Sequence, residues 1–252
     1  ALYEVTSVLD GKLIDFDNHM KRLDRSMSEL KYPRMLNHDE IKIFHKELVK
    51  KNNLIEGTVY LQVSRGIAER SFDFPDSEND FTVTAFTQEK DLINNKSALE
   101  GISVMTLEDN RWGRCDIKSI SLLPNILDKQ IAFNQGYYET WQIKDNYITE
   151  GTTSNAFIVD KNGSIRTYPK SKHILGGVTR DVIIQIAKKQ NIKIIEKAFT
   201  LNDIKWCKEA FLTSTTVKIL PVIKVNDIKI NMMKIGEITE ILTYNINKKI
   251  NG

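Results

Sequence analysis

The sequence has few of the residues that build disulfide frameworks and metal sites. It contains two cysteines and four histidines in 252 residues. Two cysteines exclude a disulfide scaffold, and the wide spacing of Cys115 and Cys207 is not that of a metal-binding pair. The histidines are scattered as well, unlike the close spacing of a zinc motif. We therefore expect no metal site.

Long apolar runs and a large net charge are also missing. No apolar run approaches the roughly 18 residues of a membrane span, and no charged-then-apolar leader opens the chain. The 36 basic and 33 acidic residues leave a net charge of +3, whereas a dedicated nucleic-acid binder usually carries a concentrated basic stripe. With 41% hydrophobic residues, the chain can fill a core. The composition therefore predicts a cytoplasmic globular protein without a nucleic-acid or membrane partner.

The first third of the chain mixes strand and helix patterns. Apolar residues recur at helical spacing after Asp17, the expected N-cap, and again after Asp39. The Asp10-Gly11 pair predicts a hairpin turn. Residues 3–8, 58–66 and 81–88 have the pattern of strands. This region predicts a small mixed α/β domain over residues 1–89.

The remainder is richer in strand patterns. Residues 89–101 are polar and poorly periodic, and we place a linker at 90–95 within them. Beyond the linker, strand patterns are interrupted by helical patterns at 120–135, 179–190 and 236–248. This mixture is neither strict βαβ alternation nor all β, so it favours an α+β fold with a barrel-like second domain over residues 96–252.

Lys118 is the first candidate for chemistry. It lies in RWGRCDIKSISLLPN between Ile117 and Ile120, ahead of an apolar run. A lysine in this setting more often extends its amine from an apolar surface into water. If it lies inside instead, burial depresses its pKa and lets it form a Schiff base with a carbonyl. The residues alone leave both interpretations open.

Glu150 is the second candidate, at a strand end in YITEGTTSNAFIV. The ordinary interpretation is a capped turn. The functional interpretation is a carboxylate held against a ring nitrogen and supported by Thr152, Thr153, Ser154 and Asn155.

Two further motifs are weak when taken singly. HILGGVTRDVI is either an ordinary loop with Thr179 near an N-cap or an anion site at the start of a helix. FLTSTTVKI adds hydroxyl groups at a strand end, where threonine is common.

Together, RCDIKS with SLLPN, TEGTTSNAF, GGVTRD and TSTT occur in an order that resembles the fold-type IV pyridoxal-phosphate enzymes, most closely the D-amino-acid (D-alanine) aminotransferases. The resemblance covers nearly the whole chain. It implies a small mixed α/β N-terminal domain and a larger pseudo-barrel domain. It also implies pyridoxal 5'-phosphate as cofactor, transamination between a D-amino acid such as D-alanine and a 2-oxo acid, and a homodimer.

The resemblance also implies roles for individual residues. Lys118 matches the lysine that bonds the cofactor, and Glu150 matches the carboxylate at its pyridine nitrogen. The other cofactor positions are Arg22, the backbone of Val178 and Thr179, and Thr215 at the phosphate, with Leu175 packing on the ring.

The same resemblance implies that Tyr3 and Arg70 bind the substrate α-carboxylate, with Arg70 reaching from the second subunit. This sequence has Arg70-Ser71-Phe72 where D-amino-acid aminotransferases read Arg-x-His, so an apolar ring replaces a second carboxylate donor. Family members also have a leader before the position of Tyr3, so we expect either a preceding segment or a shortened gene product. If the leader is absent, the first sheet would expose an unpaired edge.

Three alternatives share the fold. A branched-chain L-amino-acid aminotransferase usually has an Asn-Tyr pattern after the lysine, where this chain has Ser-Ile-Ser-Leu-Leu. An aminodeoxychorismate lyase has K-H-x-N-R there, which this chain lacks. The third is an inactive shortened relative, against which the intact Lys118 and Glu150 argue.

Overall fold

The computed structural model describes residues 1–75 and 81–251 and divides the chain into two compact units. The first unit comprises Ala1–Ile93 and Ile117–Ser121, and the second comprises Asn94–Asp116 and Leu122–Gly252. A short segment around Lys118 therefore belongs to the first unit, while its neighbours on both sides belong to the second. No helix within the described ranges combines the length and the apolar character of a membrane span.

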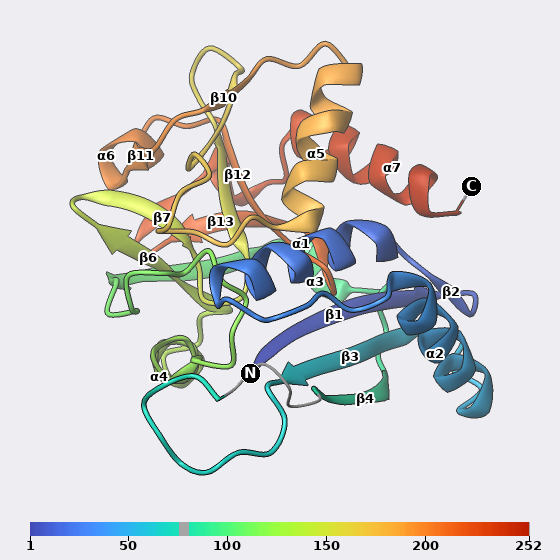
Figure 1. Ribbon diagram of the computed structural model, residues 1–252. Coiled ribbons are helices and arrows are strands. Elements are labelled where there is room, and N and C mark those ends of the chain that lie inside the picture. The colour runs from blue at the N-terminus through green and yellow to red at the C-terminus, as the bar shows by residue number, and fades with distance from the viewer. Residues whose placement is uncertain (76–80, 252) are drawn as a thin grey trace. The chain divides into compact units, whose positions relative to one another are not determined.

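The first unit is an antiparallel sheet with two helices. Its elements are β1 Leu2–Leu9, β2 Lys12–Leu13, α1 Phe16–Glu29, α2 His38–Lys51, β3 Gly57–Ser64 and β4 Thr82–Glu89. The strand order is β2-β1-β3-β4, and α1 and α2 lie on the same face of the sheet (Figure 1). The predicted Asp10-Gly11 hairpin joins β1 to β2, and both turn residues have positive φ angles, 50° and 69°.

The first helix starts before the N-cap predicted at Asp17. It begins at Phe16, and Asp15, with a φ of 52°, occupies the capping position without a side-chain cap. The carbonyl of Asp15 accepts hydrogen bonds from the backbone N–H groups of Asn18 and His19. Because the Phe16 ring is buried in the core of the unit, packing rather than the capping preference of Asp17 sets the start of the helix.

Alternation along β1 separates two sets of side chains. Leu2, Glu4 and Val8 are buried, and Glu4 reaches side chains of α1. Tyr3 points to the opposite face, where its ring stacks on Tyr60 of β3 at a centroid distance of 5.6 Å. One strand thus presents a buried acid to the helices and a phenol to the other side.

The segment around Lys118 is attached to the start of β1. Leu2 forms an isolated antiparallel bridge with Ser119, and the Ile120 N–H donates to the Ala1 carbonyl at 3.1 Å. Ile117 lies in the hydrophobic core of the first unit. These contacts fix the backbone of Lys118 on the first sheet.

The second unit is built on a sheet of ten strands with helices around it. Its strands are β5 Ile102–Glu108, β6 Glu139–Lys144, β7 Tyr147–Gly151, β8 Asn155–Val159, β9 Ile165–Thr167, β10 Ile194–Glu196, β11 Phe199–Thr200, β12 Glu209–Ser214, β13 Lys218–Val225 and β14 Ile228–Lys229. Its helices are α3 Lys96–Glu100, α4 Leu123–Asn134, α5 Val178–Lys189, α6 Leu201–Ile204, the 3-10 helix η1 Asn231–Met233 and α7 Glu237–Asn251. The helices α4, α5 and α7 lie where the sequence predicts helices.

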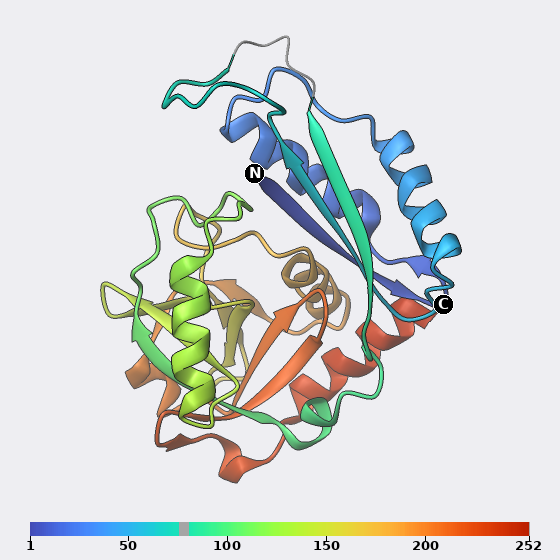
Figure 2. The same cartoon turned by 90° about the horizontal axis from the view of Figure 1, so that it is seen from below.

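The order of this sheet is β10-β9-β8-β12-β13-β5-β6-β7-β11, with β14 paired to β13. Most pairs are antiparallel, whereas β5 runs parallel to both β13 and β6, and β10 runs parallel to β9. The strands curl into an incomplete barrel (Figure 2). This mixed architecture confirms the predicted α+β class with a barrel-like second part.

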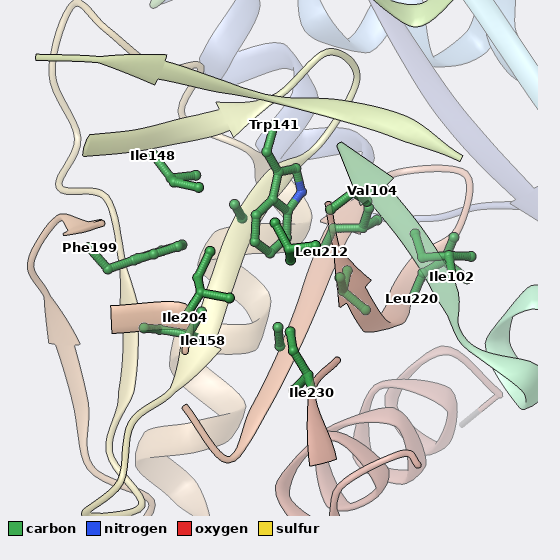
Figure 3. Packing of buried hydrophobic residues seen from close by; sticks show 14 residues of the cluster. Ile102, Val104, Trp141, Ile148, Ile158, Phe199, Ile204, Leu212, Leu220 and Ile230 are labelled. Atoms are coloured by element: carbon green, nitrogen blue, oxygen red, sulfur yellow. The ribbon is translucent and has the colours of Figure 1, made fainter. Parts of the chain in front are cut away.

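Apolar side chains from distant strands fill the interior of the second unit. Trp141 of β6, Ile158 of β8 and Leu212 of β12 are among the buried residues that point into this core (Figure 3). On the other side of the sheet, α5 and α7 pack against Phe157 and Phe211, whose rings stack at 4.8 Å. The strand β8 is thus packed on both of its faces, and β7 packs on the interior through Ile148, so both strands support the turn that joins them.

Candidate active site

The first unit brings Lys118 and Tyr3 together. The Lys118 ammonium lies 4.1 Å from the centroid of the Tyr3 ring. The backbone of Lys118 is fixed on both sides, because its carbonyl accepts from the Tyr3 N–H at 3.1 Å and its own N–H donates to the Ser26 hydroxyl at 3.3 Å. The side chain is half-buried, so it is neither fully extended into water nor fully inside, the two interpretations that the sequence leaves open. An amine held over a phenol ring has a defined position without an ion pair.

Arg22 is held by a carboxylate that the sequence analysis did not single out. Its Nε and Nη2 atoms donate to the two oxygens of Glu4 at 2.8 and 2.7 Å. The Nδ1 atom of His19 lies 2.9 Å from the same carboxylate. Burial favours a higher pKa for Glu4, but Arg22 and His19 outweigh it and bring the pKa to about 2. Glu4 therefore stays ionised and fixes one edge of the guanidinium.

Arg70 and Phe72 lie in an exposed loop of the first unit. Phe72 is 94% exposed, and the Arg70 guanidinium lies 5.1 Å from its ring centroid. In the described part of the chain, no contact joins Arg70 to Tyr3, the other residue predicted to hold the substrate carboxylate.

In the second unit, Glu150 is buried at the end of β7 and surrounded by donors. Arg111 Nη1 donates to its Oε1 at 2.6 Å, and Asn155 Nδ2 donates to its Oε2 at 2.9 Å. The Leu175 N–H lies 3.1 and 3.0 Å from the two oxygens. The predicted support from Asn155 is thus present, and Leu175 contributes its backbone to the carboxylate.

Two buried carboxylates share one guanidinium at this site. Arg111 Nε and Nη2 donate to Asp109 at 2.8 and 2.7 Å, which leaves Glu150 the single bond from Nη1. Burial raises the pKa of Glu150 to about 7, although Arg111 opposes the shift. For Asp109 the hydrogen bonds from Arg111 prevail over burial, and its pKa is lowered. Glu150 is therefore a buried acid that a second positively charged donor would stabilise in its ionised form.

The hydroxyl groups predicted to support Glu150 bind a different acid. Thr152, Thr153 and Ser154 all donate to Glu139, at the start of β6, whose side chain is fully buried. The sequence pattern shows that a hydroxyl-rich turn follows Glu150, but only the pairing of β6 with β7 shows which carboxyl group it meets.

The GGVT motif forms the start of α5. Gly177 is the N-cap and has no side chain with which to cap the helix, so the amides of the first turn, including those of Val178 and Thr179, face outward from the helix end. A Cβ on Gly177 would lie 2.1 Å from the Asn155 Oδ1 atom, so the close approach of Asn155 requires glycine there. Thr215 lies in the turn after β12.

The second unit fits a ligand with a protonated ring nitrogen and an anionic group, as pyridoxal phosphate has. Glu150 needs a further cationic partner, and the first turn of α5 offers donors to an anion. Thr213 adds a buried hydroxyl for which the described residues provide no partner. It lies directly opposite Asn155 in the β8–β12 pair, so both side chains are on the same face of the sheet. Within the described ranges, no cluster of His, Cys, Asp and Glu could hold a metal ion.

Sequence reasoning missed Arg111, Asp109, Glu139 and Glu4. All four are charged residues that become buried, and charged residues are rarely buried unless paired. Arg111 is the first residue of the RWGRCDIKS motif, and this position is the one sequence signal that could have indicated a role for it in the site. Its partner Glu150 is 39 residues away along the chain, so nothing local predicts the pair.

Comparison of sequences places these residues in a known family. The model of amino-transferase class IV matches residues 1–225. A D-alanine aminotransferase of Staphylococcus aureus (strain N315) is 37% identical over 251 residues, covering 99% of this chain and 88% of the relative. A D-alanine aminotransferase of Listeria monocytogenes serotype 1/2a (strain 10403S) is 37% identical over 244 residues, covering 95% of this chain and 83% of the relative.

Solved structures share the fold. The branched-chain amino acid aminotransferase of Escherichia coli superposes with a TM-score of 0.87 at 23% identity, covering 98% of this chain and 84% of that one. A putative 4-amino-4-deoxychorismate lyase of Legionella pneumophila gives 0.87 at 21% identity, covering 98% and 90%. At such identities the likeness concerns the fold alone. Fold and sequence agree, and the chain belongs to the class IV aminotransferases, a fold-type IV family that uses pyridoxal phosphate.

Proposed function

We propose that this protein transfers the amino group of a D-amino acid, D-alanine or a close analogue, to a 2-oxo acid. The observation that carries the proposal is the 37% identity to a D-alanine aminotransferase over 99% of the chain. The branched-chain enzyme and the lyase resemble this chain in fold at much lower identity. Substrate class follows the site rather than the fold, so the more similar sequence has the greater weight.

The reaction requires an acidic Cα–H, and pyridoxal phosphate, when bound, supplies the electron withdrawal that makes it acidic. We assign the covalent link to Lys118, whose free amine would accept the proton from the substrate Cα. Glu150 holds a proton on the ring nitrogen by charge pairing. Both roles need groups fixed in position: hydrogen bonds hold the Glu150 carboxylate, and the amine of Lys118 lies over the Tyr3 ring on a backbone fixed by two hydrogen bonds.

The remaining roles concern binding. We assign the phosphate to Arg22, to the amides of Val178 and Thr179 and to Thr215, since a phosphate dianion needs both a guanidinium and N–H donors. The Leu175 side chain packs on the cofactor ring. The α-carboxylate of the substrate is held by Tyr3 and by Arg70.

We further propose a cytoplasmic homodimer in which Arg70 serves the neighbouring subunit. The helix α4 supports the association of two copies, because Leu123, Ile126 and Leu127 share one side of it and are 68%, 60% and 59% exposed. Apolar patches of this kind often mark interfaces. Sedimentation velocity at the assay concentration tests the assembly, and an active monomer would contradict it. We propose the domain division 1–89, a linker at 90–95, and 96–252, with residues 117–121 of the larger domain packed in the first unit.

A panel of amino donors tests the function. With 2-oxoglutarate as acceptor, D-alanine should be converted to pyruvate with a higher kcat/KM than L-leucine or L-alanine shows for conversion to its own 2-oxo acid. Faster turnover of L-leucine would instead support a branched-chain enzyme, and pyruvate release from aminodeoxychorismate would support a lyase. Protein that binds the cofactor and turns over no donor would be an inactive relative.

Replacing Phe72 by histidine should lower the KM for D-alanine. Histidine adds a hydrogen-bond donor for the α-carboxylate, and one hydrogen bond to a charged group contributes about 1.5–3 kcal/mol, roughly ten- to a hundredfold in affinity. We expect the phenylalanine enzyme to tolerate D-leucine better, because its ring is apolar. Phe72→Leu is the control, since it removes the ring without adding a donor. A KM for D-alanine that stays unchanged or rises in Phe72→His would show that position 72 does not face the carboxylate.

A further inference from the structure

The turn between β7 and β8 is fixed by a single buried side chain, Glu139. The Thr153 hydroxyl donates to Glu139 Oε2 at 2.9 Å, the Thr152 hydroxyl at 3.2 Å and the Thr153 N–H at 3.3 Å. The Ser154 hydroxyl donates to the other oxygen, Oε1. One carboxyl group thus organises three consecutive residues of the turn. We call Glu139 with Thr152, Thr153 and Ser154 the Glu139 clamp.

The three turn residues of the Glu139 clamp lie between two residues of the candidate site in the sequence. Glu150 precedes the turn and Asn155 follows it, and Asn155 donates to Glu150 at 2.9 Å. The turn closes on itself, because the Gly151 N–H donates to the Ser154 carbonyl at 2.8 Å. The shape of the turn therefore contributes to the distance between the Glu150 carboxylate and its Asn155 donor.

The close approach of Glu139 depends on Gly151. A Cβ at that position would lie 2.3 Å from Glu139 Oε1 and 2.4 Å from the Ser154 hydroxyl oxygen. The φ angle of Gly151 is not in the left-handed region, so space rather than backbone freedom requires glycine. The EGTTS sequence is thus shaped around the acid on the neighbouring strand.

A buried carboxyl group without a cation among its hydrogen-bond partners is costly unless its acceptors are all used. In the clamp both oxygens are used, and every donor comes from the turn. A network that is satisfied in this way is rigid, because each bond restricts the others. We infer that Glu139 is a positioning residue that holds Glu150 and Asn155 in the geometry needed to pair with the cofactor ring nitrogen. This inference rests on the role proposed above for Glu150.

The test compares Glu139→Gln with two reference variants. Glu150→Gln removes the carboxylate itself. Glu209→Gln is the matched control, because Glu209 is a second buried acid of the same unit that accepts from a threonine hydroxyl, Thr239, at 2.7 Å and from its N–H at 2.8 Å. It stabilises the start of α7 rather than the turn after Glu150. Ser154→Ala, which removes one donor only, is a milder variant of the clamp in case Glu139→Gln does not fold.

Three quantities are measured for each variant: the dissociation constant of pyridoxal phosphate from the apoenzyme, the pH at which the bound cofactor's absorbance changes, and the temperature of unfolding. A glutamine accepts on one atom only, so the turn loosens, and we expect Glu139→Gln to weaken cofactor binding by about tenfold, the effect typical of groups that orient a ligand. The absorbance change should move to lower pH, as in Glu150→Gln but by less, because the ring nitrogen loses its charge partner in part. Ser154→Ala should move it in the same direction.

The outcomes separate the two proposals. The clamp acts through Glu150 if Glu139→Gln changes both cofactor readouts as expected. In that case Glu209→Gln should lower the unfolding temperature as much as Glu139→Gln but leave both cofactor readouts unchanged. If Glu150→Gln shifts the absorbance change while Glu139→Gln and Ser154→Ala do not, Glu139 has only a structural role and the inference is wrong. If Glu150→Gln itself shifts nothing, the proposed role of Glu150 fails.

Discussion

Lys118→Ala is expected to abolish turnover and the absorbance band of the lysine-bound cofactor. The alanine side chain can neither bond the cofactor nor accept a proton, and proton transfer alone contributes about 10²- to 10⁴-fold to the rate. The first sheet should keep its structure, since the segment around position 118 is attached to β1 through its backbone. Reduction with borohydride followed by mass spectrometry identifies the modified lysine in the wild type.

Lys129→Ala is the matched control for this prediction. The Lys129 ammonium lies 4.2 Å from the Tyr138 ring centroid, nearly the same contact that Lys118 makes with Tyr3 at 4.1 Å, but in the second unit and without a proposed role. Loss of activity in Lys118→Ala alone is the expected result. Transamination at the wild-type rate by Lys118→Ala would contradict the assignment.

Arg111→Met is expected to destabilise the protein by about 3–5 kcal/mol, because it leaves two buried carboxylates without their cation. Arg111, Asp109 and Glu150 are each exposed by no more than about 5% at the side chain, so water cannot replace the lost bonds. Denaturant unfolding of the apoprotein measures the loss directly.

This loss should be larger at pH 8 than at pH 5. The pKa of Glu150 is about 7 in the folded protein, above its ordinary value of 4.5. As the pH rises from 4.5 to 7, this group ionises first in the unfolded chain, so the wild type already loses stability over this range. Without Arg111 its folded pKa rises further, and the penalty continues to grow above pH 7. At lower pH the carboxyl group is protonated in both folded proteins, and the difference between them shrinks.

Arg114→Met is the control. Arg114 pairs with Asp116 two residues away, as Arg111 pairs with Asp109, but its side chain is 37% exposed. The Asp116 side chain is 8% exposed, but the exposed Arg114 lets water reach this pair, so we expect a smaller loss than in Arg111→Met. If the two variants lose similar stability, or if the loss in Arg111→Met does not depend on pH, then Arg111 does not carry the charge balance of the site.

The sequence alone determined much that is local in this protein. The Asp10-Gly11 turn, the helices α4, α5 and α7 and the mixed fold class follow from turn chemistry and apolar periodicity, which act over a few residues. The order of four short motifs was enough to indicate the family that the sequence comparison establishes.

The tertiary structure alone decided which side chains meet. The sequence places hydroxyl groups beside Glu150, yet strand pairing brings Glu139 to them from a separate strand. Burial of Phe16 moves the start of α1 away from the expected cap at Asp17. Arg111 reaches Glu150 across 39 residues, and Lys118 is fixed to a strand that begins the chain. Such contacts depend on strand register and on the removal of charges from water, and neither has a local signature in the sequence.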